Sequence, residues 1–316
     1  MYKENYSNNK RKTFRKQLAL NVSISISVSD EYMFPIVDKK DVTPESVWFK
    51  IEAPEIAKVC KAGQFIILRS NEKGERIPLT VSDWDQDEGW LTVIFQKVGA
   101  STYELADYNV GDSLSDCVGP LGVPTHVEEA GNTIVIGGGL GIAIATPVAR
   151  AYKQAGNHTE VIIGARKSEL LFNVEVIQEF ADKLRICTDD GSEGRHGFVT
   201  DELQEMIDQG QKIDTVFCVG PPIMMKFVAK VTEPYNIKTI ASLNTIMLDG
   251  TGMCGACRLT VGGETKFACV DGPDFDAHQV EWEETMARLA SYKDEEKEAM
   301  EHYREHHKEC QREKGS

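Results

Sequence analysis

The hydrophobic pattern from about residue 31 to residue 128 is a series of short apolar runs separated by Gly, Pro, Asp and Asn. Clear examples are SVWFKIEA (residues 46–53), GQFIILRS (63–70) and GWLTVIFQKV (89–98). Runs rich in β-branched and aromatic residues and bounded by turn residues are typical of β-strands. Helical periodicity in this region is confined to residues 101–108. Closely spaced strands without long helices predict an antiparallel β-barrel over residues 31–128.

The pattern changes at about residue 131, where apolar strands begin to alternate with helical stretches. The segment NTIVIGGGLGIAIATPVARAYKQAG (132–156) contains a strand, a glycine turn and a helix in succession. Further strands and helical stretches follow in TEVIIGAR (159–166), LLFNVEVIQEFADK (170–183), LRICTDDGS (184–192), GFVTDELQEMIDQG (197–210) and IDTVFCVGPPIMMKFVAKV (213–231). This alternation predicts a parallel α/β sheet over residues 129–240.

The remainder is a compact Gly- and Cys-rich segment, and from Phe275 the chain becomes charged. Its Glu and Lys mixture predicts a solvated helix with one apolar stripe, made of Val280, Met286, Leu289 and Tyr292. At the other end, Asn and Ser interrupt the apolar stretch that a secretory signal requires, so a basic arm is expected there. The expected parts are an N-terminal extension (1–30), a barrel (31–128), an α/β domain (129–240), a cysteine-rich domain (241–278) and a charged helical tail (279–316).

Composition narrows the classes of function. The net charge of -15 argues against binding to nucleic acid or to anionic membrane surfaces, which attract cationic patches. No apolar run approaches the length of about 18 residues that a membrane span needs. Eight cysteines are present, of which three cluster and five are scattered, at Cys60, Cys117, Cys187, Cys218 and Cys310. That distribution indicates a reducing compartment, the cytoplasm, and one metal-type site.

The cysteine cluster has an unusual spacing. Cys254, Cys257 and Cys269 follow Asp249 in the order D-x4-C-x2-C-x11-C. A plant-type [2Fe–2S] site uses C-x4-C-x2-C and a distant fourth Cys. The spacing therefore predicts such a cluster, with Asp249 in place of the first cysteine.

Two alternatives to this assignment stay open at this stage. Asp271 and Asp274 are other carboxylates that stand near the cysteines. A zinc site would need a second C-x2-C or a His pair. His278 is the nearest histidine, and its spacing is poor.

Glycines 137, 138, 139 and 141 lie between the first predicted α/β strand and its helix. Glycines there let a backbone approach a pyrophosphate at a helix N-terminus. The spacing is G-G-G-x-G rather than G-x-G-x-x-G, so tight packing of strand on helix is the alternative reading. Glu160 is the one candidate for a ribose-binding acid, which is expected about 20 residues further on.

Two shorter motifs add to the nucleotide hypothesis. RIPLT (76–80) combines Arg, Pro and a hydroxyl residue on a barrel strand, although an Arg in a surface ion pair on an edge strand with Pro is the more common case. VGPPIMM (219–225) ends the last predicted strand, where open α/β sheets bind ligands, although a plain turn into a helix is the alternative. Because strand side chains alternate between faces, Cys218 is expected to point away from the site if Val219 faces it.

Together these motifs resemble the ferredoxin–NADP reductase superfamily over roughly residues 33–282. The loop DGTGMCGACRLTVGGETKFACVDGPDFD is similar to that of the small (alpha) subunits of NADH-dependent reduced ferredoxin:NADP oxidoreductases, also called sulfide dehydrogenase subunits. It also resembles the electron-transfer subunits of dihydroorotate dehydrogenase, which carry four cysteines there. The fold this implies is a barrel that binds FAD, an α/β domain that binds NAD(P) and a small C-terminal [2Fe–2S] domain.

The resemblance also implies residue roles. The residues expected to hold FAD are Arg76, Pro78, Leu79, Thr80, Gly99, Ser101 and Thr102. Those expected to face NAD(H) are Gly138, Gly139, Gly141, Ile142, Gly220, Pro221, Met224 and Met225, with weaker candidates in Gly164, Ala165, Arg166, Asp189 and Asp190. No side chain is assigned as a catalytic acid or base.

By the same resemblance the chain is an oxidoreductase subunit that exchanges a hydride between NAD(H) and FAD and passes electrons through the [2Fe–2S] cluster. Its expected partner is a large subunit with flavin and [4Fe–4S] clusters that binds NADP(H) and ferredoxin, in an electron-bifurcating hetero-oligomer. The alternatives are the electron-transfer subunit of dihydroorotate dehydrogenase and, in a different class, a non-enzymatic zinc-binding adaptor.

Overall fold

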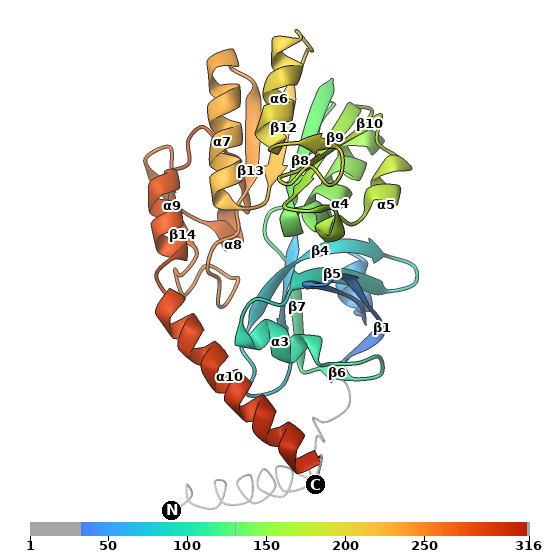
Figure 1. Cartoon of the computed structure of the whole chain (residues 1–316), viewed down its shortest axis with the longest axis vertical. Coiled ribbons are helices and arrows are strands. Elements are labelled where there is room, and N and C mark those ends of the chain that lie inside the picture. The colour runs from blue at the N-terminus through green and yellow to red at the C-terminus, as the bar shows by residue number, and fades with distance from the viewer. Residues whose placement is uncertain (1–32, 130, 315–316) are drawn as a thin grey trace, which may run out of the picture. The chain divides into compact units, whose positions relative to one another are not determined.

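The computed structural model describes residues 33–129 and 131–314 of the chain (Figure 1). The predicted N-terminal extension, residues 1–30, lies outside the described residues. Within the described ranges, no helix has both the length and the apolar character that a membrane span requires.

The N-terminal part of the described chain is an antiparallel sheet that curves into a nearly closed barrel, as predicted. Its strands are β1 (Phe34–Thr43), β2 (Ser46–Glu52), β3 (Phe65–Arg69), β4 (Ile77–Asp85), β5 (Trp90–Gln96), β6 (Ser113–Leu114) and β7 (Asp116–Leu121), in the order β6-β1-β2-β5-β4-β3-β7. The two edge strands, β6 and β7, are joined through Ser115 alone, so the sheet must bend round on itself. Two short helices, α2 (Pro54–Ala57) and α3 (Ala100–Ala106), complete this part.

The barrel core follows from the period of two along each strand. Val47, Phe49 and Ile51 of β2 are all buried, and they alternate with residues that are more exposed. Phe49 meets Phe95 of β5 edge to face, with ring centroids 5.2 Å apart. Burial of this alternating set fixes the register of β2, because a shift by one residue would turn the apolar side chains outward.

The next part is a parallel α/β sheet, again as predicted. Its strands are β8 (Asn132–Gly138), β9 (His158–Ala165), β10 (Lys183–Thr188), β11 (Arg195–His196), β12 (Thr215–Val219), β13 (Lys238–Ser242) and β16 (Asp274–Asp276), in the order β11-β10-β9-β8-β12-β13-β16. All neighbours in this sheet are parallel except β13 and β16. The expectation of a charged helical stretch from Phe275 is wrong at its start, because residues 274–276 return to pair with β13.

Helices cover both faces of this sheet (Figure 1). One face packs against α4 (Ile142–Gln154) and α5 (Val174–Gln178), and the other against α6 (Val199–Asp208) and α7 (Pro222–Thr232). Three single turns, η1 (Gly139–Gly141), η2 (Ser168–Leu170) and η3 (Glu233–Tyr235), lie in the connections. In this order the strand β8 lies between β9 and β12, where the direction of winding reverses. Open α/β sheets bind ligands at such a point.

The cysteine-rich segment is mostly loop. It contains a hairpin of β14 (Arg258–Val261) and β15 (Glu264–Phe267) and the short helix α8 (Ala268–Asp271). Helices α9 (Trp282–Leu289) and α10 (Lys293–Lys314) follow.

The apolar stripe predicted for the tail only partly forms. Val280 is buried before α9 begins, whereas Tyr292 is 54% exposed. The tail instead contacts the barrel through Tyr303, whose ring lies 5.9 Å from that of Tyr103 on α3 and whose hydroxyl donates to Asp107 at 3.0 Å. The sequence pattern missed this contact because α10 is charged almost throughout.

Candidate functional site

A cavity of about 1240 Å³ lies where the barrel meets the carboxyl ends of the parallel strands. Ligand sites usually occupy about 300–1,000 Å³, so this cavity has room for more than one small ligand. Its walls come from β4, β5, the glycine turn, the start of α7 and the segment that leaves β13. That last segment supplies Ser242, Leu243, Asn244 and Met247, which sequence reasoning missed because no motif marks them.

The predicted FAD residues divide into two groups. Pro78, Leu79, Thr80 and Thr102 line the cavity. Thr102 is fixed at the start of α3, since its hydroxyl accepts hydrogen bonds from the N–H groups of Val98 at 3.0 Å and Gly99 at 3.1 Å.

The other predicted FAD residues do not line the cavity within the described chain. Arg76 is exposed, and Gly99 is half-buried with open space around it. The Ser101 hydroxyl is hydrogen-bonded to Glu75. FAD contacts by these three residues stay a prediction.

The glycine turn serves both purposes considered from the sequence. A Cβ at Gly141 would lie 2.3 Å from the Val219 carbonyl oxygen, so packing against the backbone requires this glycine, whereas a Cβ at Gly138 would lie 2.3 Å from the sulfur of the flexible Met224 side chain. Gly139 has a φ of +54° and nothing within 4 Å of an added Cβ, and it lines the cavity. Packing therefore shapes the turn, and its open side faces the cavity.

The end of β12 also reaches the cavity, through Val219, Gly220, Pro221 and Met224. Gly220 has a φ of +153°, and a Cβ there would lie 2.8 Å from the Gly138 carbonyl oxygen. Cys218 packs in the core on the opposite face of the sheet, as the alternation of side chains predicts.

Two of the predicted NAD(H) residues do not reach the cavity with their side chains. Ile142 and Met225 are both 0% exposed and belong to the cores on either side of the sheet. Their assignment as contacts of the nucleotide stays a prediction without support from their placement.

The ends of β9 and β10 form the outer part of the same cavity. Gly164, Ala165, Arg166 and Asp189 line it, and the Arg166 guanidinium lies 3.3 Å from the carboxylate of Glu45, which also lines it. Asp190 does not line it; its carboxylate accepts hydrogen bonds from Ser192.

Glu160 is not a ribose-binding residue. It lies near the amino end of β9, opposite to the cavity, and it is buried. Its carboxylate pairs with the guanidinium of Arg185 at 3.0 Å.

The cysteine loop brings two of the three predicted cysteines together. The sulfurs of Cys257 and Cys269 are 3.2 Å apart and buried, while Cys254 is exposed at the loop surface. Two sulfurs at about 2.3 Å from one tetrahedral metal lie roughly 3.8 Å apart, so this pair needs little movement to share a metal. Burial and the neighbouring Cys257 raise the pKa of Cys269 to about 12, and a bound metal would displace that proton.

Asp249 is held close to Cys254. Its carboxylate accepts hydrogen bonds from the N–H groups of Thr251 at 2.9 Å and Cys254 at 2.8 Å, and these bonds lower its pKa. In the part of the chain that the structure describes, no three His, Cys, Asp or Glu side chains already stand in the arrangement of a metal site. Ligation by Asp249 and Cys254 therefore requires the exposed part of the loop to adjust.

The other candidate ligands are occupied elsewhere. The Asp271 carboxylate accepts a hydrogen bond from the Phe267 N–H at 2.7 Å, and Asp274 accepts one from the Thr125 hydroxyl at 2.6 Å. His278 is hydrogen-bonded to the Thr232 hydroxyl at 2.9 Å.

The cysteine loop adjoins the cavity. Met247 lines the cavity and stands two residues before Asp249, so their Cα atoms lie within about 7 Å. The loop also packs on the barrel, because a Cβ at Gly250 would lie 2.8 Å from Ile67 of β3 and 2.7 Å from Leu121 of β7.

Comparison with known families matches two segments of the chain. The iron–sulfur cluster binding domain of dihydroorotate dehydrogenase B matches residues 244–281. The oxidoreductase NAD-binding domain matches residues 135–230. The first segment contains the cysteine loop, and the second contains the glycine turn.

Relatives match most of the chain. A homologue of the dihydroorotate dehydrogenase B (NAD(+)) electron transfer subunit from Thermotoga maritima is 44% identical, over 85% of this chain and 94% of its own length. An uncharacterised Clostridium beijerinckii protein is 48% identical, over 85% and 93%. The dihydroorotate dehydrogenase B electron transfer subunit of Desulforamulus reducens is 30% identical, over 77% and 95%.

Among solved structures, one chain of the NADH-dependent reduced ferredoxin-NADP oxidoreductase, determined for insight into flavin-based electron bifurcation, is 42% identical. It has a TM-score of 0.82 and covers 87% of this chain and 99% of its own. Phthalate dioxygenase reductase, at 17% identity and a TM-score of 0.52, covers 78% of this chain and 76% of its own and shows a shared fold alone. The resemblance drawn from the sequence motifs is confirmed.

Proposed function

The chain belongs to the family of dihydroorotate dehydrogenase B electron-transfer subunits and their homologues, and from this premise we propose that it exchanges a hydride between NAD(H) and FAD and passes electrons through a [2Fe–2S] cluster to a partner subunit. The observation that carries the proposal is one cavity that is lined by the barrel, the glycine turn and Met247, which stands two residues before Asp249 at the start of the cysteine loop. A binding pocket for one ligand would not need all three.

The cavity fits two cofactors from opposite sides. Pro78, Leu79 and Thr80 on β4 offer the wall for FAD, and Thr80 supplies a hydroxyl. Across the cavity, Gly139 and Pro221 offer a wall without bulky side chains, which suits a nicotinamide nucleotide. The roles of Arg76, Gly99, Ser101, Ile142 and Met225 in these sites come from the family resemblance alone.

Bound FAD would supply an acceptor for the hydride of the nicotinamide, and a bound cluster would supply an acceptor for single electrons. The chain's own part is to hold the two rings together and to exclude water. Leu79, Leu243 and Met247 make the wall between the two sites and the cysteine loop largely apolar. No acid or base is required for transfer of a hydride, and none is proposed.

The cluster ligands proposed are Asp249, Cys254, Cys257 and Cys269. Cys257 and Cys269 would hold one iron, because their sulfurs already lie 3.2 Å apart. Asp249 and Cys254 would hold the other, because a hydrogen bond already joins them. Asp249 is a harder donor than a thiolate with the same charge, so it should change the potential of the cluster.

A partner subunit is proposed to cover the exposed side of the loop. Leu248, Met253 and Val270 are 54%, 88% and 42% exposed around the cysteines. We propose that this partner is a large flavin and [4Fe–4S] subunit that binds NADP(H) and ferredoxin, in an electron-bifurcating hetero-oligomer. Asp249 favours this complex, because by resemblance the dihydroorotate dehydrogenase type has a cysteine at this position. The second candidate is the electron-transfer subunit of dihydroorotate dehydrogenase, which the names of the relatives favour.

The test is anaerobic expression in the native host, followed by purification through a tag on this chain. Flavin and iron bands in the visible spectrum, about two irons and one FAD per chain of this type, and bleaching by NADH are expected. A colourless protein that holds zinc would overturn the proposal in favour of the adaptor. The co-purified subunit decides between the two complexes. A partner that oxidises dihydroorotate would favour dihydroorotate dehydrogenase over the electron-bifurcating complex. Free cysteines throughout the described chain also lead us to propose the cytoplasm as its location.

A further inference from the structure

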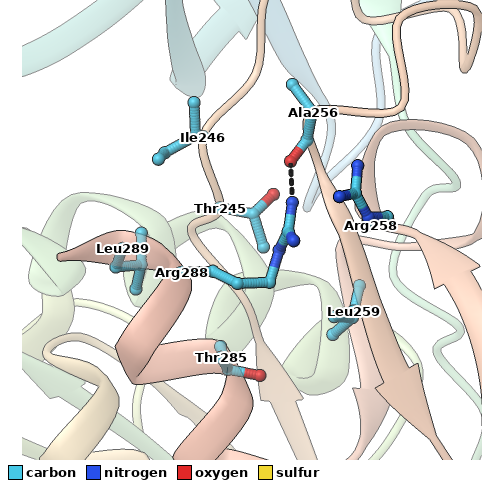
Figure 2. Close-up of a pocket in the computed structure, with 8 residues that line it drawn as sticks. All are labelled: Thr245, Ile246, Ala256, Arg258, Leu259, Thr285, Arg288 and Leu289. Atoms are coloured by element: carbon cyan, nitrogen blue, oxygen red, sulfur yellow. Dashed lines mark hydrogen bonds between the residues drawn. The ribbon is translucent and has the colours of Figure 1, made fainter. Parts of the chain in front are cut away.

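Two arginines donate hydrogen bonds to successive carbonyl oxygens in the turn between Cys254 and Cys257. Arg258, the first residue of β14, donates to the Gly255 oxygen at 3.2 Å. Arg288, in the last turn of α9, donates to the Ala256 oxygen at 3.1 Å (Figure 2). The two guanidinium groups come from separate elements and bind to the same short turn.

The Arg288 side chain is half-buried. It lines a small pocket together with Thr245 and Thr285 (Figure 2). The helix that carries it is anchored by a hydrogen bond from the Trp282 indole to the Ala277 oxygen at 3.0 Å and by an ion pair of Glu283 with Lys226 on α7. The hydrogen bond and the ion pair fix the helix from which the guanidinium reaches the Ala256 carbonyl.

The carbonyl contacts also orient two N–H groups. In a trans peptide the N–H points opposite to the C=O. With the Gly255 and Ala256 oxygens turned toward the arginines, the N–H groups of Ala256 and Cys257 point away from them. Neither of these N–H groups has an acceptor among the described residues. They are therefore free to donate to a sulfur of a cluster held by the loop.

The charge of the arginines acts in the same direction. Reduction adds one negative charge to a cluster, and hydrogen bonds and nearby cations stabilise that charge. The chain as a whole is acidic, with 50 Asp and Glu against 35 Lys and Arg. Asp249 and Asp271 are carboxylates in or beside the loop, and the two guanidinium groups carry the opposite charge. Arg258 is exposed and more strongly screened by water than the half-buried Arg288.

We propose that Arg288, with a smaller contribution from Arg258, is a positioning residue that orients the turn between Cys254 and Cys257 and raises the reduction potential of the cluster. This inference rests on the proposed function, because it requires the [2Fe–2S] cluster.

The test is a redox titration of the purified complex, with the reduced cluster followed by EPR. Arg288→Gln is expected to lower the midpoint potential by about 59 mV, a tenfold change in the ratio of reduced to oxidised cluster for a one-electron couple. Arg288→Lys, which keeps the charge, should recover about half of the shift, and Arg258→Gln should give a smaller shift. Lys183→Gln, which removes a charge at the amino end of β10, is the matched control.

A midpoint potential of Arg288→Gln equal to that of the Lys183→Gln control would overturn the inference, and so would equal shifts in the Lys and Gln variants. If Arg288→Gln loses iron, the midpoint potentials of Arg288→Lys and Arg258→Gln test the inference instead. Both potentials should then differ from that of the Lys183→Gln control. Hydrogen exchange at Ala256 and Cys257 in the iron-loaded chain gives a second measure, and it should quicken in every arginine variant. Absence of a reducible iron–sulfur signal in the wild type would instead contradict the proposed function.

Discussion

Asp274 provides a sharp test of the energetics of this fold. It lies on β16, paired in register with Ser242, and the Thr125 hydroxyl donates to it at 2.6 Å. Burial raises its pKa to about 6, and hydrogen bonds with Thr125 and Ser242 oppose this rise. The titratable groups beside it are Tyr152 and Cys218, and burial raises the pKa of each above its ordinary value. Both therefore stay neutral between pH 5 and pH 7.5.

The raised pKa determines the sign of the pH dependence. Between the unfolded pKa near 4 and the folded pKa near 6, the folded chain binds more protons at this residue than the unfolded chain. Stability from Asp274 is therefore present at low pH and lost as the pH rises through 6. A rise of about two pKa units means that the free energy of unfolding falls by roughly 3 kcal/mol between low pH and pH 7.5. About half of this loss has already occurred at pH 5.

The perturbation is Asp274→Asn, which keeps the shape and an acceptor for Thr125 but cannot ionise. We expect the free energy of unfolding of this variant, relative to wild type, to rise by about 1.5 kcal/mol between pH 5 and pH 7.5. At about 2 °C per kcal/mol for a chain of this size, the difference in Tm should grow by roughly 3 °C.

The assay is thermal unfolding of the cofactor-loaded chain across that pH range, with Asp87→Asn in an exposed turn as the control. A difference in Tm that stays constant with pH, or that shrinks as the pH rises, would refute the reasoning from burial. A uniform loss of stability in Asp274→Asn would mean only that Asn packs poorly, since it is the slope that reports the ionisation.

Three further predictions concern the site. Asp249→Ala should lose iron, whereas Asp249→Cys should keep it and change the EPR spectrum and the potential; full iron content in the Ala variant would remove Asp249 as a ligand. Gly141→Ala, whose methyl group would overlap the backbone of β12, should lower the free energy of unfolding by about 1–3 kcal/mol. Gly139→Ala should lower it by about 1–2 kcal/mol, because the φ of this residue is positive, and should chiefly weaken the binding of NADH. Glu45→Gln should raise the rate with NADPH relative to NADH by up to about fivefold, equivalent to 1 kcal/mol, because Arg166 would lose its ion pair; an unchanged ratio of the two kcat/KM values would argue against this pair.

The sequence predicts the architecture well because both halves depend on local periodicity. The alternation in β2 and the strand, glycine turn and helix around Gly138 are each contained within a few residues. The strand β16 was missed because only three residues pair, and their pairing with β13 depends on a partner more than 30 residues earlier. Tyr303 was missed for a similar reason, since its contact with α3 is fixed by tertiary packing.

The site shows the same division between local and distant information. Spacing alone selected Cys257 and Cys269, which the fold brings together. It could not select Met247 or Leu243, because an ordinary apolar residue carries no signal of the cavity that it lines. Met225 shows the reverse case: the motif that contains it reaches the cavity, but the turn of α7 directs this side chain into the core.

The residues that spacing cannot find are the ones that join the two centres. The segment from Ser242 to Met247 leaves the carboxyl end of β13, lines the cavity and leads directly to Asp249. A chain that only bound a nucleotide would gain nothing from routing this wall into a cysteine loop, and a chain that only bound a metal would not need the cavity. The short connection therefore argues that selection acted on transfer between the sites, and that changes at Met247 should affect the rate of electron transfer more than the binding of either cofactor.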